Sequence, residues 1–303
     1  MESILEHTGL YDDTLRYPAS ARDLRALWSL RRQVRSGRYD CLVYLAKPKG
    51  GVFTSVRDYL FFRSCGIPKL IGVPFSRRTL HCDRIPGTTR YKSETVRTTD
   101  AIESLGTADL KDPKWWDMRL TATETAEADA VLAKHGITAP FLAASVGTKI
   151  QSKDWEEPNW NELIGRLAAR HPGLPLVLFG VTEERERSDR MLALWRGPKA
   201  NLCGETTPRV SAAVLRNAVV MVCHDSGPMH LAATMGIPCV AIFSARNKPG
   251  EWFPRGEGHT IFYHQTPCWG CGLVECVDKK KACILSITVD EVEAAVERTL
   301  RGR

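Results

Sequence analysis

The stretch 219–244, VVMVCHDSGPMHLAATMGIPCVAIFS, decides the fold, because two apolar runs typical of buried strands enclose a polar turn and a helix. Asp225 or Ser226 is expected to cap that helix, and Pro228 suits its first position. Gly227 lets a ligand approach the backbone closely. Free amide groups and the positive end of the helix dipole then favour a phosphate. The patch alone predicts an anion site and a simple helix cap equally well.

The same order of strand, polar loop and helix occurs three times in the second half of the chain. This alternation indicates an α/β fold with a parallel sheet. The three loops therefore meet at the carboxyl edge of the sheet, where open α/β sheets bind their ligands. The predicted strands are 141–147, 174–180 and 219–225, and the helices begin near residues 158, 183 and 228.

The first half of the chain contains one clear unit of strand, helix and strand. The strands are predicted at 39–46 and 69–74, with the helix between them ending at Gly66. Loops with short helices are expected from Phe75 to about Leu120. Further helices are predicted for 121–135 and, capped by Thr288, for 288–300. A boundary near Ile137 would divide the chain into domains 1–136 and 137–303.

Composition restricts the class of protein. The 303 residues fit two domains of ordinary size, and 43% hydrophobic with 25% charged residues is typical of globular proteins. No run approaches the roughly 18 apolar residues that a membrane span needs. The N-terminus lacks the features of a secretion signal, so a cytoplasmic location with reduced thiols is expected. The net charge of +7 suits an anionic ligand but also occurs in proteins that bind none.

Charged side chains in the two neighbouring loops favour the anion site. Lys149 and Lys153 follow the first of the three strands, and Glu183, Glu184 and Glu186 follow the second. Lysines can neutralise a diphosphate, and a carboxylate can accept both hydroxyls of a ribose. The three loops together predict a site for a nucleoside-diphosphate sugar.

Two tryptophans and two histidines lie near these loops. Trp155 and Trp160 are expected to pack in the core rather than to stack on a base. His224 and His230 flank the polar patch, and either could contact phosphate, assist a proton transfer or hydrogen-bond within the helix start. Of the two, His230 is the favoured ligand contact.

Three motifs resemble the C-terminal half of glycosyltransferase family 9, the heptosyltransferases of lipopolysaccharide assembly. They are SKDW at 152–155, the loop GVTEERERS at 180–188 and HDSGPMHLAATMGIPCVAIF at 224–243. This resemblance implies the α/β fold called GT-B, two Rossmann-like domains facing a cleft, with the nucleotide-sugar donor held by the C-terminal domain. It implies the substrate-binding residues Thr148, Lys153, Glu184, Asp225, Ser226, Gly227 and His230.

The start of the chain departs from this family. Members usually begin with a strand and an SLGD-like loop whose Asp is the general base, and no such motif precedes ILEHTGLYDD here. The N-terminal domain is therefore expected to lack its first βαβ step. Either the start codon is assigned too far downstream in the gene, or the gene is incomplete, or the protein is a natural variant with another base or none. Asp12, Asp13 and Asp58 are nearby acids, and the catalytic residue stays unassigned.

The resemblance also implies an activity. A heptose-like sugar would pass from an ADP-linked donor to a lipopolysaccharide core or another saccharide at the inner membrane surface. The chain has no DxD-type signature for a metal-bound diphosphate, so no cofactor is expected for transfer, and no nucleic acid is expected as a partner. The alternatives are a catalytically impaired nucleotide-sugar-binding protein, a protein O-heptosyltransferase and a sugar-nucleotide epimerase.

Four of the ten cysteines cluster in CWGCGLVECVDKKKAC at 268–283. Four thiolates in a reducing compartment suit a tetrahedral structural Zn²⁺ or iron ion, with Cys268, Cys271, Cys276 and Cys283 as ligands. The run also resembles a cysteine-rich insert of iron-carrying autotransporter heptosyltransferases. A redox CxxC pair and four unrelated buried thiols are the alternatives. The other six are expected to be small core residues: Cys41, Cys65, Cys82, Cys203, Cys223 and Cys239.

Overall fold

The structure is a computed structural model that describes residues 2–16, 23–48, 50–138 and 140–302. Its contacts divide the chain into two compact units. Unit 1 comprises residues 1–10 and 116–303, and unit 2 comprises residues 11–115. All seven residues predicted to bind substrate belong to unit 1.

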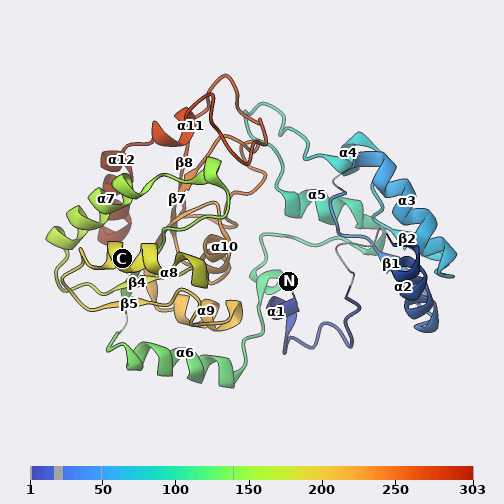
Figure 1. Ribbon diagram of the computed structural model, residues 1–303, viewed down its shortest axis with the longest axis horizontal. Coiled ribbons are helices and arrows are strands. Elements are labelled where there is room, and N and C mark those ends of the chain that lie inside the picture. Colours follow the sequence, from blue (N-terminus) through green and yellow to red (C-terminus); the bar gives the residue numbers. More distant parts are fainter. Residues whose placement is uncertain (1, 17–22, 49, 139, 303) are drawn as a thin grey trace. The chain divides into compact units, whose positions relative to one another are not determined.

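Unit 1 is built on a six-stranded parallel sheet with the order β5-β4-β3-β6-β7-β8 (Figure 1). The chain runs outward from β3 in one direction and from β6 in the other. This reversal creates a crevice at the carboxyl ends of the two strands, where doubly wound sheets bind ligands. The strands are β3 (Phe141–Ser145), β4 (Leu176–Leu178), β5 (Lys199–Asn201), β6 (Ala218–His224), β7 (Cys239–Phe243) and β8 (Thr260–Tyr263).

Helices cover both faces of this sheet (Figure 1). Side chains alternate along β3, so that Leu142 and Ala144 enter one hydrophobic core and Phe141 and Ala143 enter the other. The first core is completed by α7 (Glu157–Arg170), α8 (Arg185–Leu192), α11 (Ala282–Leu285) and α12 (Val289–Arg301). The second is completed by α6 (Ala122–Lys134), α9 (Pro208–Leu215) and α10 (Gly227–Thr234).

Local sequence signals set the helix ends. Thr121 and Thr288 each accept a hydrogen bond from the third residue of the following helix, whose glutamate bonds back to the cap. Thr207 caps α9, which begins with Pro208. The predicted N-cap of the last helix at Thr288 is thereby confirmed.

The buried Arg209 ties the first residues of the chain to unit 1. Its side chain is 2% exposed and forms an ion pair with Glu124. It also donates to the backbone carbonyls of Ile4, Met118 and Arg119 at 3.1, 2.8 and 2.9 Å. The short helix α1 (Glu2–Leu5) is therefore fixed against α9.

Unit 2 contains a two-stranded parallel sheet and several short helices. Leu42 of β1 and Leu70 of β2 pack on a small core formed by α2 and the end of α3. The predicted loops between 75 and 120 contain the short helices expected there. The elements are α2 (Leu24–Ser36), β1 (Cys41–Val43), α3 (Gly51–Ser64), β2 (Lys69–Ile71), α4 (Arg77–Leu80), α5 (Glu94–Ala101), η1 (Glu103–Leu105) and, at its end, η2 (Pro113–Trp116).

The structure divides the chain earlier than the boundary predicted near Ile137. Helix α6 precedes that point, yet Ala128 and Leu132 lie in the second core of unit 1. The Glu124–Arg209 ion pair holds the same helix to α9. Tertiary packing that local sequence does not display therefore assigns α6 to unit 1.

Candidate functional site

A cavity of about 880 Å³ lies at the carboxyl edge of the unit 1 sheet. The loops after β3, β4, β5 and β6 contribute to it, as the parallel topology requires. Its volume falls in the range of ligand pockets. This edge cavity is lined by all seven predicted substrate-binding residues: Thr148, Lys153, Glu184, Asp225, Ser226, Gly227 and His230.

Lys153 and Asp225 form an ion pair in the edge cavity. The Lys153 Nζ lies 2.6 Å from Asp225 Oδ2, and the two side chains are 14% and 7% exposed. The ammonium also donates to the Asp225 backbone carbonyl at 3.3 Å, and Asn247 Nδ2 donates to Oδ2 at 3.3 Å. Lys153 lies in the short helix η3 (Gln151–Lys153), after β3, whereas Asp225 directly follows β6. A cation is thus fixed between the two central strands.

The start of α10 carries no side-chain cap, contrary to the sequence prediction. Ser226 occupies the N-cap position, but its side chain makes no capping hydrogen bond, and Asp225 is engaged by Lys153. The Ser226 Oγ is buried, with no hydrogen-bond partner in the described part of the chain. Helix α10 begins at Gly227, so Pro228 is its second residue. An anion at this end would meet amide groups that no side chain neutralises.

The Glu184 side chain packs against Gly147 and Gly180 where it enters the edge cavity. A Cβ on Gly147 or on Gly180 would collide with its carboxyl group, so both positions leave the room that this side chain occupies. Its Oε2 accepts a hydrogen bond from the Val181 amide at 3.0 Å. Burial raises the pKa of Glu184 above its ordinary value, against the lowering effect of that bond. The carboxyl group therefore lies in a partly dry wall of the cavity.

The other predicted charges divide between the edge cavity and the surface. Lys149 and Glu183 line the cavity. Glu186 does not, because it pairs with Arg190 at 3.0 Å on an exposed face of α8. The prediction that all three glutamates converge is therefore wrong for Glu186.

His224 is a buried structural group. Its Nε2 accepts the Trp155 backbone N–H at 3.1 Å and the Trp160 indole N–H at 3.3 Å, so Nδ1 carries the proton and donates to the Gly147 carbonyl. Burial lowers the pKa of His224 to about 4. This neutral ring does not contact the edge cavity, whereas His230 lines it and has a pKa that burial lowers.

The two tryptophans pack in the core, as predicted. Trp155 and Trp160 are both 0% exposed and meet edge to face with 5.4 Å between ring centroids. Neither can stack on a ligand base. Five further residues that line the edge cavity were not predicted, and they come from α1 and from the segment after β5: Ile4, Gly204, Thr206, Pro208 and Ser211.

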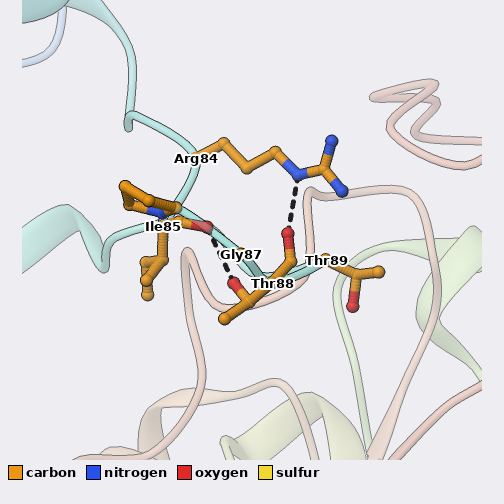
Figure 2. Close-up of a pocket in the computed structure, with 6 residues that line it drawn as sticks. Arg84, Ile85, Gly87, Thr88 and Thr89 are labelled. Carbon is orange, nitrogen blue, oxygen red and sulfur yellow. Dashed lines mark hydrogen bonds between the residues drawn. The ribbon is translucent and has the colours of Figure 1, made fainter.

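A second hollow of about 380 Å³ lies in unit 2, at the turn 84–89. Figure 2 shows that the turn closes on itself, with Arg84 Nε donating to the Thr88 carbonyl and Thr88 Oγ1 to the Ile85 carbonyl. None of the predicted site residues lines it. The edge cavity of unit 1 is therefore the candidate functional site.

The four clustered cysteines line one small cavity of about 10 Å³, the space of a single water or small ion. All four are free thiols. As placed, no three His, Cys, Asp or Glu side chains among the described residues form a group that could hold a metal ion. The donor set fits a thiophilic ion, but the side chains are not closed into a ligand shell. Of the six cysteines predicted in the core, five are buried and Cys41 is exposed.

A sequence profile of glycosyltransferase family 9 (heptosyltransferase) matches residues 27–282. The chain belongs to glycosyltransferase family 9. Lipopolysaccharide heptosyltransferase 1 of Pseudomonas aeruginosa is 31% identical over 157 residues, which are 50% of this chain and 40% of that protein. The chain therefore spans less than half the length of this family 9 relative.

Solved family 9 structures share the fold. The glycosyl transferase family 9 protein of Veillonella parvula matches with a TM-score of 0.67 and 15% identity, over 100% of this chain and 86% of that one. The E. coli heptosyltransferase WaaC, solved with ADP-2-deoxy-2-fluoro heptose, matches with a TM-score of 0.54 and 18% identity, over 90% and 76%. The predicted α/β fold of the GT-B type is confirmed. In the described residues, no helix is both long and apolar enough to span a membrane.

Proposed function

We propose that this family 9 chain transfers a heptose-like sugar from an ADP-linked donor to a saccharide acceptor. The observation that carries the proposal is the edge cavity, in which a paired lysine, an uncapped helix start and a half-buried glutamate lie together. The structure of WaaC with an ADP-heptose analogue supports this choice of donor. Family membership supports the transferase class.

The donor is proposed to lie across the central strands. Its diphosphate would lie against Lys153 and the first amides of α10, near Ser226, Gly227 and His230. Its ribose hydroxyls would donate to Glu184, whose loop follows β4. Thr148 would complete the wall of the cavity. Its Oγ1 accepts a hydrogen bond from the Ile150 amide at 3.3 Å, which holds the side chain in place.

The proposed chemistry is direct displacement at the anomeric carbon. The acceptor oxygen forms the new bond as the bond to the diphosphate breaks, and negative charge develops on the leaving phosphate. Fixed donors that point at this charge lower the barrier without reorganising. Lys153 and the α10 amides supply such donors, so we propose transfer without an obligatory divalent cation. No residue of this chain is assigned as the base.

The proposed acceptor is a lipopolysaccharide core or another saccharide. The Pseudomonas aeruginosa relative is a lipopolysaccharide heptosyltransferase, which favours that acceptor class. We place the reaction in the cytoplasm, at the inner membrane surface where such acceptors are built. Fractionation of cells into cytosol and membrane, with and without high salt, tests this location.

Titration calorimetry tests the donor site. ADP should bind more tightly than UDP or GDP, and Lys153→Ala should weaken ADP binding while leaving adenosine binding unchanged. Glu184→Gln should weaken both, because the ribose is common to them. Lys69→Ala, an exposed lysine of unit 2, serves as the matched control. Absence of ADP binding by the native chain would refute the donor site.

Mass spectrometry of mixtures with ADP-heptose and truncated lipopolysaccharide tests the reaction. A product heavier by one heptose supports the transferase. Donor binding without any product would favour the nucleotide-sugar-binding alternative, and an epimerised donor would favour an epimerase. Heptose on a protein hydroxyl instead of a saccharide would favour a protein O-heptosyltransferase.

We also propose that Cys268, Cys271, Cys276 and Cys283 hold a structural zinc or iron ion. The support is that four free thiols line one ion-sized cavity. Binding would require their side chains to turn inward, and the ion would stabilise the segment rather than take part in transfer. Metal analysis of protein purified without chelator should find about one equivalent. The variant Cys271→Ser should lose most of it, whereas Cys41→Ser should not.

A further inference from the structure

One short turn forms part of two different cavities. Ile150 and Lys153 line the edge cavity, whereas Ser152 between them lines the cavity of the four cysteines. Helix η3, which contains Ser152 and Lys153, has only three residues. A displacement of Ser152 must therefore move Lys153 as well.

The cysteine-rich segment, residues 268–283, holds this turn by three hydrogen bonds. The buried Ser152 donates its amide to the Val274 carbonyl at 3.0 Å and its Oγ to the Leu273 carbonyl at 2.6 Å. Gln151 Oε1 accepts the Cys276 amide at 2.9 Å. Neither Gln151 nor Ser152 lines the edge cavity. The hydrogen bonds of Gln151 and Ser152 instead connect the turn that carries Lys153 to the backbone of the cysteine-rich segment at residues 273–276.

The same segment also holds the partner of that lysine. Arg246 donates to the Leu273 and Gly272 carbonyls at 2.6 Å each. The next residue, Asn247, donates to the Asp225 carboxylate. The segment thus reaches Lys153 through Ser152 and Asp225 through Arg246 and its neighbour.

A buried lysine of the segment fixes the far side of the turn. Lys281 is 6% exposed, donates to the Asp154 carbonyl at 3.1 Å and pairs with Glu156 at 2.7 Å. Residues 151–156 are therefore held by two parts of the cysteine-rich segment, residues 273–276 and Lys281. A backbone held at so many points has few alternative positions.

We propose that the cysteine-rich segment positions the Lys153–Asp225 pair for the donor, with Gln151 and Ser152 as positioning residues. The inference rests on the proposed donor site. On this proposal, an ion bound to the four thiols, or a chemical modification of them, changes the affinity of the edge cavity for the donor. A donor that favours the held position of residues 151–153 should therefore also make local opening of the cysteine-rich segment rarer.

The first test is ADP binding by calorimetry. Gln151→Ala removes the acceptor for the Cys276 amide and should weaken ADP binding about 3- to 10-fold, the value of one hydrogen bond. Gln151→Glu keeps an acceptor and should restore most of the affinity. Ser152→Ala should weaken binding similarly, and if it does not fold, the exposed Gln151 decides. Ser36→Ala in unit 2 is the control for loss of a hydroxyl.

The second test is maleimide labelling of each cysteine, read by peptide mass spectrometry. Saturating ADP should make local opening rarer and slow labelling of Cys276 at least about twofold in the native chain and in Gln151→Glu, but not in Gln151→Ala. ADP binding with native affinity in both Gln151→Ala and Ser152→Ala, without protection of Cys276, would overturn this inference and leave the donor site standing. No ADP binding by the native chain would overturn both.

Discussion

The Lys153 ammonium lies 2.6 Å from the Asp225 carboxylate, so the cation proposed for the diphosphate is already paired before a donor arrives. Both groups are largely buried, and loss of either leaves the other uncompensated. One of the three N–H bonds of the ammonium group remains for a phosphate, because the other two point to the carboxylate and the backbone carbonyl of Asp225. The pair therefore fixes the position of a charge that a flexible lysine would otherwise spread over many rotamers.

Lys153→Ala and Asp225→Ala should each weaken donor binding, and their effects should not add. In the double variant, the second substitution should cost about 1–3 kcal/mol less than it does alone, because the shared ion pair is already lost. Calorimetry with ADP on the native chain and three variants measures this coupling. Additive losses would show that the two residues act on the donor independently.

Gly147→Ala should fold but lose the function of Glu184. A Cβ at this position would meet the carboxyl group of Glu184, the mobile end of a side chain, which can move away. ADP affinity should fall to about the level of Glu184→Ala, and combining the two changes should cost nothing more. Gly165→Ala in α7 is the control, since nothing lies within 4 Å of its added Cβ. Native ADP affinity in Gly147→Ala would remove Glu184 from the site.

Arg209→Met should destabilise unit 1 strongly. It leaves the buried Glu124 carboxylate unpaired, where Arg209 holds the pKa of that group at about 2, and removes donors from three backbone carbonyls. Breaking a buried ion pair of this kind costs about 3–5 kcal/mol. Urea unfolding followed by tryptophan fluorescence measures the loss. The exposed Arg216→Met should change stability by no more than about 0.5 kcal/mol.

Acid should weaken the fold through His224. Its folded pKa of about 4 lies below the ordinary value of 6.5, so the unfolded chain binds more protons between these values. The stability that the neutral ring provides is complete above pH 6.5 and is lost as the pH falls toward 4, by roughly 3 kcal/mol at most. His230 acts in the same direction, because burial lowers its pKa too. Glu124 acts only below its ordinary value of 4.5.

Urea unfolding at several pH values between 7.5 and 4.5 checks this expectation. His224→Gln should be less stable at neutral pH and should show a smaller loss on acidification. An equally steep pH profile in His224→Gln would assign the acid sensitivity to other groups. Asp154, Lys153 and Arg187 are charged neighbours that act on the ring, and they stay in place in this variant.

Sequence patterns predicted β3, β4, β6 and the helices that follow them because their signals are local, whereas β5, α9 and β8 were not predicted. Apolar runs and the cap Thr288 act within a few residues. Parallel topology then brings the seven predicted site residues to one edge, although Lys153 and Asp225 are 72 positions apart. The convergence follows from strand order, which the alternation of elements indicates.

Features that depend on long-range packing could not be predicted in the same way. The pairing of Lys153 with Asp225 removes the aspartate from its expected capping role at α10. The contribution of Ile4 to the edge cavity depends on Arg209, and no local pattern displays it. Glu186 lies in the same glutamate-rich stretch as Glu184, so the sequence does not distinguish the two. Its position on α8 places its carboxylate beside Arg190 instead of in the edge cavity.

The bond between Arg209 and the Ile4 carbonyl joins positions 205 apart in the sequence. During synthesis residues 2–5 therefore lack their final contacts until Arg209 has left the ribosome. Unit 2 is complete as a sequence long before that point and can fold first. The edge cavity can be completed only later, since its lining extends to Leu231 and α1 can take its place beside α9 only after α9 exists.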